Sequence, residues 1–301
     1  MAIAKRAVSQ PVSLPAPTGG WNARDALTAM SPLDAVTLTN WFPATTECTL
    51  RNGYAKWATG ISGQVQTIMN YAGSIDSQLF AIANGAVYDV TAQGDVGDPV
   101  LDGLSNSQWG YCNISTSGGN FISMANGVDT PYVYDGFSWT VASITGTGVT
   151  ITALRDPILF ARRQFFIESG TLKAWYLDVD SIGGTVNPVD VSAYATKGGY
   201  IVAHGTWTID AGQGVDDHYV LVTSRGQVIV FQGINPSGET ATDWSMVGIW
   251  DLGSPVGRRC MYKWAGDMLI ITQDGVVPMS AALQSSRVNP KVALTDKIQY
   301  A

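Results

Sequence analysis

Five aspartates could supply the pair of carboxyl groups that hydrolyses a glycosidic bond: Asp178, Asp180, Asp210, Asp243 and Asp251. That reaction needs two carboxyl groups at a set separation, one of them with a raised pKa. Their positions in the sequence do not define such a pair. The Ser-x-Asp-x-Gly-x-x-Trp box that recurs in sialidase blades is also absent from the sequence. We therefore expect no enzymatic activity and assign no catalytic residues.

The two histidines, His204 and His218, point to no reactive centre either. His218 follows Asp216 and Asp217, which could suggest a metal or acid–base site, but a metal site needs further ligands at suitable spacing and none is apparent. We interpret His218 as part of a polar loop that leads into a strand at 219–222. Residue order does not exclude a Ser-His-Asp triad, yet no Gly-x-Ser-x-Gly elbow occurs. No metal and no cofactor is predicted.

Charge argues against tight binding of nucleic acid. The chain of 301 residues has a net charge of −7 and no long basic run, whereas phosphate contacts need clustered Lys and Arg. The pairs Arg162-Arg163 and Arg258-Arg259 could touch DNA phosphates, but we favour interface or blade-edge roles for them. A weakly acidic surface would let DNA move past without capture.

Composition favours a cytoplasmic protein that assembles with other subunits. Charged residues make up 14% of the chain, against about 25% in an average globular protein, so we expect neighbouring subunits to cover part of the surface. The three cysteines, Cys48, Cys112 and Cys260, are far apart and suggest buried thiols rather than disulfides. No apolar run reaches the roughly 20 residues of a membrane span, and the N-terminus lacks the apolar core of a secretory signal.

Five glycine turns recur along the chain with steps of 42, 43, 56 and 49 residues between their glycines. Each lies between segments that are apolar or alternate in polarity, which is typical of a hairpin. A hairpin repeat of roughly 40–50 residues is the length of a β-propeller blade. The sequence therefore predicts an all-β fold, a propeller-like ring of about five to six hairpin-based blades. The turns are Asn84-Gly85, Asn126-Gly127, Ser169-Gly170, Arg225-Gly226 and Asp274-Gly275.

Three regions are expected. Residues 1–58 form an extended N-terminal docking arm with one short helix, because Ser31-Pro32 resembles an N-cap followed by proline in the first turn. Residues 59–283 form the propeller-like domain, and 284–301 are a C-terminal tail or the start of a further element. The tryptophans of the arm, Trp21 and Trp41, are predicted to dock on another surface. Those of the blades are predicted to pack between blades: Trp139, Trp175, Trp207, Trp244 and Trp264.

Several segments occur in an order found in one family of virion proteins. They are 19–25, 30–35, 38–43 and 51–53 in the arm, then 175–177, 197–199, 214–217, Pro236 with Trp244, 255–259, 274–280 and 293–298. Together they resemble the tail nozzle, or tail tubular, proteins of short-tailed bacteriophages. Many members of that family are longer than this chain, and the resemblance carries over no catalytic residue.

The resemblance implies a ring, typically of six subunits, in the virion tail below the portal and its adaptor protein. Such a ring closes the tail tube, passes DNA on ejection without sequence-specific binding, and can carry tail fibre or spike proteins. In that setting the arm would bind the adaptor or a neighbouring subunit. The residues assigned to this contact are Trp21, Arg24, Trp41, Phe42 and Arg51.

Two alternatives remain open. A receptor- or glycan-binding propeller would expose tryptophans on one face and bind host glycans measurably. A glycan-cleaving propeller, which is less favoured, would place two carboxylates close together in a central pocket. The position of the subunit in its assembly would discriminate among all three hypotheses.

Overall fold

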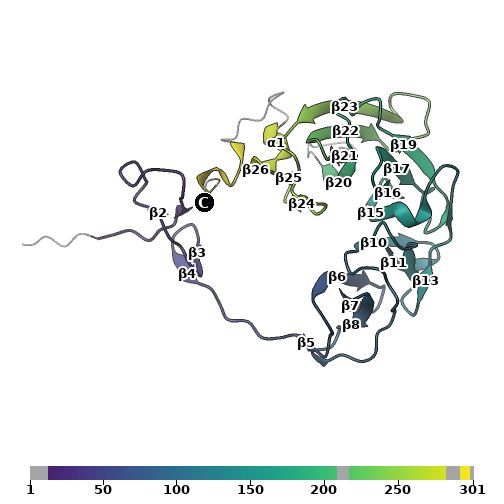
Figure 1. Ribbon diagram of the computed structural model, residues 1–301, viewed down its shortest axis with the longest axis horizontal. Helices are drawn as coiled ribbons and strands as arrows, with labels where there is room; N and C mark the ends of the chain where they lie inside the picture. The colour runs from purple at the N-terminus through teal and green to yellow at the C-terminus, as the bar shows by residue number, and fades with distance from the viewer. Residues whose placement is uncertain (1–12, 209–216, 283–291, 299–301) are drawn as a thin grey trace, which may run out of the picture. The chain divides into compact units, whose positions relative to one another are not determined.

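The computed structural model describes residues 13–208, 217–282 and 292–298 (Figure 1). The chain divides into two compact units. The larger is Lys56–Ala293, and the smaller combines Met1–Ala55 with Leu294–Ala301. The predicted tail at 284–301 is thus split, and its last residues belong with the arm.

The larger unit is a β-propeller, and its described residues form five blades of antiparallel strands that follow one another around a centre (Figure 1). This confirms the predicted fold class. The blades are, in order, β6 (Val65–Ala72), β7 (Ser77–Ala83) and β8 (Ala86–Asp89); β10 (Gly110–Thr116), β11 (Gly119–Ala125), β12 (Tyr132–Tyr134) and β13 (Trp139–Val141); β15 (Leu154–Phe160), β16 (Arg163–Glu168), β17 (Lys173–Tyr176) and β19 (Asn187–Asp190); β20 (Ile201–Thr208), β21 (Asp217–Thr223), β22 (Gln227–Gly233) and β23 (Trp244–Asp251); and β24 (Met261–Trp264), β25 (Asp267–Thr272) and β26 (Gly275–Pro278).

Every predicted glycine turn joins the second strand of a blade to the third. All five glycines have a positive φ, a conformation that residues with a Cβ rarely adopt. At Gly226 a Cβ would also lie only 2.3 Å from the carbonyl oxygen of Leu252. The repeat was readable in the sequence because the same turn recurs at the same place in each blade.

The remaining short elements lie in the segments that connect or follow the blade strands. β14 (Ile144–Thr145) pairs in parallel with β18 (Gly184–Thr185), and η1 (Ile151–Ala153) precedes β15. β18 and β19 fall within the extra sequence at 178–203, which accounts for the longest step between glycines. The helix α1 (Met279–Ala282) follows β26. No helix of the described residues is long and apolar enough to cross a membrane.

Four apolar cores hold neighbouring blades together, one for each pair from the first and second blades to the fourth and fifth. The core between blades three and four is rich in aromatic rings, with Phe231 stacked on Trp244 at 5.2 Å between ring centroids. Trp175 and Trp207 are buried, and Trp139 and Trp244 pack against these cores, as predicted. The prediction for Trp264 is wrong, because its side chain is 62% exposed on the fifth blade.

The first and fifth blades differ from the others. No buried apolar cluster of the described residues joins them. The face of the first blade that is turned away from the second carries Ala81 and Tyr88. That face packs against the segments around β5 (Ala58–Thr59) and β9 (Gly94–Asp95), which pair in parallel. What holds the fifth blade to the first must therefore be something other than a shared apolar core.

The smaller unit contains short strand pairs. β1 (Gly20–Trp21) pairs in parallel with β2 (Asp34–Ala35), β3 (Trp41–Pro43) pairs with β4 (Cys48–Leu50), and η3 (Asp296–Ile298) is a single 3-10 turn. The helix predicted at Ser31-Pro32 is wrong, since the chain turns there and enters β2. A short isolated helix is costly to nucleate, and the hydrogen bonds of β2 and the Asp34 side chain compete with it.

Candidate functional site

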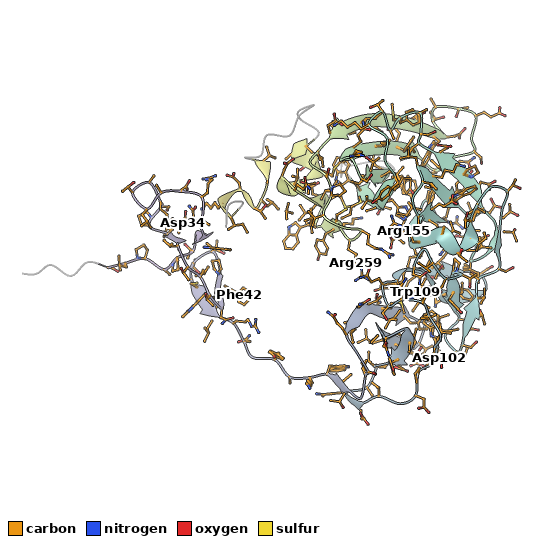
Figure 2. All side chains as sticks on the ribbon, viewed as in Figure 1. Asp34, Phe42, Asp102, Trp109, Arg155 and Arg259 are labelled. Carbon is orange, nitrogen blue, oxygen red and sulfur yellow. The ribbon has the colours of Figure 1, made fainter. Side chains whose placement is uncertain are left out.

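A cavity of about 610 Å³ lies at the centre of the propeller, lined by the innermost strands of all five described blades. Figure 2 shows Trp109 and Arg259 on the inner side of the blades. In most ligand-binding proteins such a cavity is the first place to look for function. Its lining includes Thr67, Trp109, Asp156, His204 and Arg259, together with several apolar side chains.

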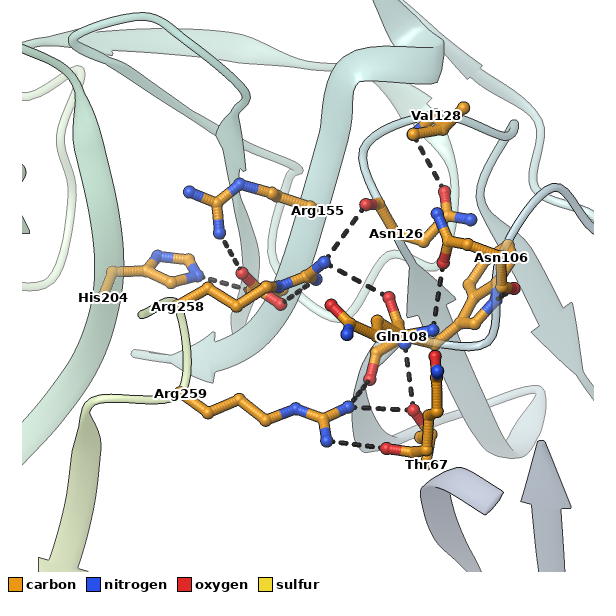
Figure 3. Close-up of polar contacts among 12 residues, drawn as sticks. Thr67, Asn106, Gln108, Asn126, Val128, Arg155, His204, Arg258 and Arg259 are labelled. Atoms are coloured by element: carbon orange, nitrogen blue, oxygen red, sulfur yellow. Dashed lines mark hydrogen bonds and ion pairs between the residues drawn. The ribbon is translucent and has the colours of Figure 1, made fainter. Parts of the chain in front are cut away.

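Two consecutive arginines cross this cavity from the loop that precedes β24 (Figure 3). Arg259 donates hydrogen bonds to the Gln66 carbonyl at 2.7 Å and to Thr67 Oγ1 at 2.8 Å, both on the first blade, and to the Trp109 carbonyl at 3.2 Å. The guanidinium thus joins the fifth blade to the first two.

Arg258 reaches the second and third blades. Its Nη1 donates to the carbonyl oxygens of Gln108 and Asn126, and its Nη2 lies 2.6 Å from Asp156 Oδ1. Together Arg258 and Arg259 form what we call the arginine clasp. Because no buried apolar core of the described residues joins the fifth blade to the first, the clasp supplies polar contacts across this seam.

Asp156 is the acidic partner of Arg258 in the clasp. It has a φ of +51°, an unusual value for a residue other than glycine, and it lies at the irregularity where β15 shifts register against β16. Its carboxylate also pairs with Arg155, whose Nη2 donates to the Ile201 carbonyl at 2.9 Å. Burial lowers the pKa of Arg155, so the Asp156 carboxylate offsets part of the cost of holding that charge inside the protein.

His204 completes the network without adding charge. Its Nε2 contacts the Asp156 carbonyl oxygen, so Nε2 carries the proton, and Nδ1 accepts from the Tyr219 hydroxyl at 2.7 Å. Burial lowers the pKa of His204 to about 4 and raises that of Tyr219. At neutral pH both groups are therefore uncharged, and the imidazole orients the Asp156 backbone.

The His204 pKa predicts a pH-dependent stability. Between pH 6.5 and 4 the unfolded state binds a proton that the folded state excludes, so the free energy of unfolding falls as pH falls and levels off below about 4. We expect the His204 contribution to reach about 3 kcal/mol. Urea unfolding at pH 7 and pH 4 measures the loss of stability in the wild type, which includes the His204 contribution. In a His204→Gln variant the loss in free energy of unfolding between pH 7 and pH 4 should be smaller by about 3 kcal/mol. An equal loss in the variant and the wild type would contradict the lowered His204 pKa.

The cavity is poorly equipped for acid–base or nucleophilic catalysis. Among the described residues Asp156 is the one carboxylate in its lining, and it is ion-paired. Burial raises the pKa of the Cys260 thiol to about 11 and that of Cys112 to about 12, so both are protonated at neutral pH. No group of three or more His, Cys, Asp and Glu side chains among residues 13–208, 217–282 and 292–298 could hold a metal ion.

The aspartates considered for glycoside hydrolysis lie elsewhere. Asp178 and Asp180 pair with Arg163 and Arg162, and the other two described aspartates accept from Thr240 or pair with Lys197. None of these four lines the central cavity, while Asp210 lies outside the described residues. His218 lies in β21 beside Trp207 rather than in a loop, and Asp216 also lies outside the described residues.

The predicted docking residues share one unit, but the contacts described below do not gather them into one cluster. Trp21 and Trp41 are 43% and 47% exposed, and Phe42 is 56% exposed. The Trp21 indole donates to the Val36 carbonyl at 2.9 Å. The Arg51 backbone N–H donates to the Asn40 carbonyl, and the Arg51 side chain is exposed.

Arg24 has a structural task that the sequence did not suggest. Its guanidinium pairs with Asp25 and with Asp296, although 272 residues separate Arg24 from Asp296. Lys297 Nζ lies 2.8 Å from Asp34 Oδ1, and the Ala23 N–H donates to the Lys297 carbonyl at 2.9 Å. We call these contacts the terminal latch. They join residues near the two ends of the chain within the smaller unit.

Hydrogen bonds hold the acidic residues of the terminal latch in the charged form. The Arg24 guanidinium, with Asn22, lowers the pKa of Asp25 to about 2, and Lys297 lowers that of Asp34. The fully buried Asn22 donates to both carboxylates, at 2.9 and 2.7 Å.

Replacing Asp34 with alanine should open the terminal latch, because Asn22 loses one of its two carboxylate acceptors and Lys297 loses its ion-pair partner. We expect the Ala23 amide, which donates to the Lys297 carbonyl, to exchange with solvent at least about tenfold faster, since about 1.4 kcal/mol of lost protection gives that factor. Hydrogen exchange measured by NMR would test this. The exposed Asp98 provides a matched control, and equal exchange in both variants would contradict the latch.

The chain was compared with protein families, curated proteins and solved structures. No family model matches the chain, and no curated protein matches it. A crystal structure of BBS1N in complex with ARL6DN, soaked with mercury, is similar with a TM-score of 0.44 and 13% identity over 70% of this chain and 62% of that chain. The lead-soaked form has a TM-score of 0.46 and 12% identity over 77% and 66%.

A third similar structure is PorZ, described as a bacterial surface component of the type-IX secretion system of Porphyromonas gingivalis. Its TM-score is 0.43, with 14% identity over 75% of this chain and 27% of that chain. This chain spans less than two thirds of the length of each of these structures. At these values the similarities carry no conclusion about activity or partners, and the propeller assignment rests on the strand order described above.

Proposed function

We propose that this chain is a structural subunit of a phage tail ring of the nozzle type. In this role it attaches below the portal and its adaptor, closes the tail tube, and lets DNA pass on ejection. The ring is built from copies of this chain, six by the family resemblance, and the finished assembly is part of the virion tail. The nozzle assignment rests on the resemblance of the sequence segments.

One structural observation supports an assembling subunit more than any other. In the described part of the smaller unit, the one buried residue is Asn22, and no apolar side chain is buried. A segment that orders its backbone without burying apolar surface gains little to offset the entropy it loses. Trp41, Phe42 and Leu50, in the β3–β4 pair, are 47–61% exposed. Such aromatic and aliphatic groups are typical anchors of subunit interfaces.

The central cavity also bears on the path of DNA. The arginine clasp crosses it from the fifth blade to the first three, so side chains already occupy the axis of the propeller. In the proposed ring, DNA therefore passes through the space bounded by several subunits and not along the axis of any one propeller. This path needs no sequence-specific contact with DNA.

A cryo-EM map of the virion tail, with peptide mass spectrometry of purified particles, tests the proposal. We expect the chain to be present in several copies around the tail axis, between the adaptor and the distal end. Absence from purified virions, or a single copy at the tip, would overturn it.

A receptor-binding or glycan-binding module is the second candidate, and the fifth blade supplies the observation that favours it. Tyr262 and Trp264 are 59% and 62% exposed, and their ring centroids lie 6.3 Å apart. Exposed aromatic rings of this kind can stack on sugar rings. Titration of host surface glycans against the wild type and a Trp264→Ala variant would distinguish the two candidate functions. A glycan-binding module should bind glycans through Trp264, whereas neither form of a purely structural subunit should bind them measurably.

A further inference from the structure

The centre of the propeller carries an excess of positive charge. Arg155 and Arg258 pair with the single carboxylate of Asp156, while the guanidinium of Arg259 is held by the neutral oxygens of Gln66, Thr67 and Trp109. His204 is neutral at pH 7, since burial lowers its pKa to about 4. The network therefore has two more positive than negative charges, in a chain whose net charge is −7.

The hydrogen bonds within the clasp do not remove this excess. Most of the acceptors are neutral carbonyl or hydroxyl oxygens, such as those of Gln66, Thr67 and Asn126. Arg258 Nε is buried and has no hydrogen-bond partner. Among the described residues Arg259 contacts no carboxylate, so an added anion at this place would gain a charge-assisted contact.

The open part of the cavity is apolar. Ile68 from β6 and Tyr262 from β24 line it and are 60% and 59% exposed, and Met261 and Ile271 also contribute. Arg259 is itself exposed, so a ligand can reach its guanidinium. The cavity thus combines an apolar rim on the first and fifth blades with a cationic interior.

We propose that this cavity binds a carboxylate side chain flanked by apolar residues on a peptide segment of a partner protein. Arg259 contacts the carboxylate through an N–H donor that is not used in its contacts with Gln66, Thr67 and Trp109. Ile68 and Tyr262 contact the apolar neighbours of that carboxylate. The negative charge of the carboxylate complements the positive charge of the arginines in the cavity. A bare inorganic anion would leave the apolar rim uncovered. The assignment goes beyond the proposed ring and does not depend on it.

Isothermal titration of acetyl-Phe-Asp-Phe-amide against the full-length chain tests the site, with acetyl-Phe-Asn-Phe-amide as the neutral match. In low salt we expect the aspartate peptide to bind at least about tenfold more tightly than the asparagine peptide, with a preference that declines as salt is added. Inorganic phosphate, added as a competitor, distinguishes a site for any anion from one that also needs the apolar flanks, because it should displace the peptide only weakly. Equal affinity for the two peptides, or strong displacement by phosphate, would overturn the proposal.

Substitutions in the cavity test whether the peptide binds at this site. Arg259→Gln should abolish the preference for the aspartate peptide, whereas Arg162→Gln, at an exposed arginine outside this cavity, should leave it unchanged. Because the first variant also weakens the clasp, a second pair tests the site without removing an arginine. Ile68→Glu supplies a carboxylate within the cavity and should lower the affinity for the aspartate peptide at least about tenfold, while Ile68→Gln, which removes only an apolar contact, should lower it less and should keep the preference for aspartate over asparagine. Unchanged preference in both Arg259→Gln and Ile68→Glu would contradict the site.

Discussion

Replacing Arg258 with alanine is expected to lower the free energy of unfolding of the propeller by about 3 kcal/mol. The substitution removes hydrogen bonds to Gln108 and Asn126 and takes one of two guanidinium partners from the Asp156 carboxylate. Truncating one partner of a buried charge network typically costs about 3–5 kcal/mol of stability. We expect the cost of Arg258→Ala to lie toward the lower end of that range, because the Arg258 side chain is 23% exposed. Urea unfolding followed by tryptophan fluorescence measures this loss.

Two controls separate the clasp from a general effect of losing an arginine. Arg162→Ala removes an arginine whose side chain is 74% exposed, and it should change the free energy of unfolding by less than about 1 kcal/mol. Arg258→Lys keeps the charge but cannot form the same set of contacts, so its stability should lie between wild type and alanine. If Arg258→Ala were no more destabilising than Arg162→Ala, the clasp would not be what holds the fifth blade.

The second large effect is expected on assembly. The double substitution Trp41→Ser and Phe42→Ser removes two exposed aromatic side chains from β3. Truncated interface anchors typically cost about 2 kcal/mol or more each, which corresponds to at least a hundredfold weaker self-association for the pair. Sedimentation velocity over a concentration series would show smaller species, while circular dichroism should show an unchanged propeller.

A matched control for that experiment lies in the second blade. Phe137 is 93% exposed, so Phe137→Ser also removes an exposed aromatic ring but leaves the smaller unit intact. We expect it to associate as the wild type does. Loss of association in Phe137→Ser with none in the Trp41 and Phe42 variant would place the interface on the propeller, contrary to the predicted docking role of the arm.

The blades could be predicted from the sequence because their signals are local. Each turn, such as Asn84-Gly85 or Asp274-Gly275, combines a glycine of positive φ with flanking apolar segments. The helix at Ser31-Pro32 was predicted from equally local signals and is wrong. Its residues form a turn and a strand whose partner, Gly20–Trp21, lies more than ten residues away in the sequence.

The central network could not be predicted in the same way. Arg258, Arg259 and Asp156 are brought together by the closing of the blades, and the pairs they form are separated by 102 to 193 residues. From the sequence, interface or blade-edge roles were therefore favoured over DNA contact for the two arginines, and neither Asp156 nor Arg155 was singled out. A charged Arg-Asp pair inside the otherwise apolar segment Leu154–Phe160 was the available signal.

The exposure of Trp264 and the contacts of the terminal latch could not be predicted from local sequence patterns either. Trp264 resembles the other blade tryptophans in sequence, but among the described residues its ring lies near the exposed Tyr262 and belongs to no buried apolar cluster. The pairing of Arg24 with Asp296 depends on a meeting of distant segments that no local pattern records.

The mass of the assembled protein tests the central claim most directly. Native mass spectrometry of the full-length chain, together with the same measurement on complexes released from virions, should give a discrete multiple of 32.0 kDa, six copies being the number that the family resemblance implies. A protein that remains a monomer at every concentration, and is recovered from virions as a monomer, would contradict a ring-forming subunit.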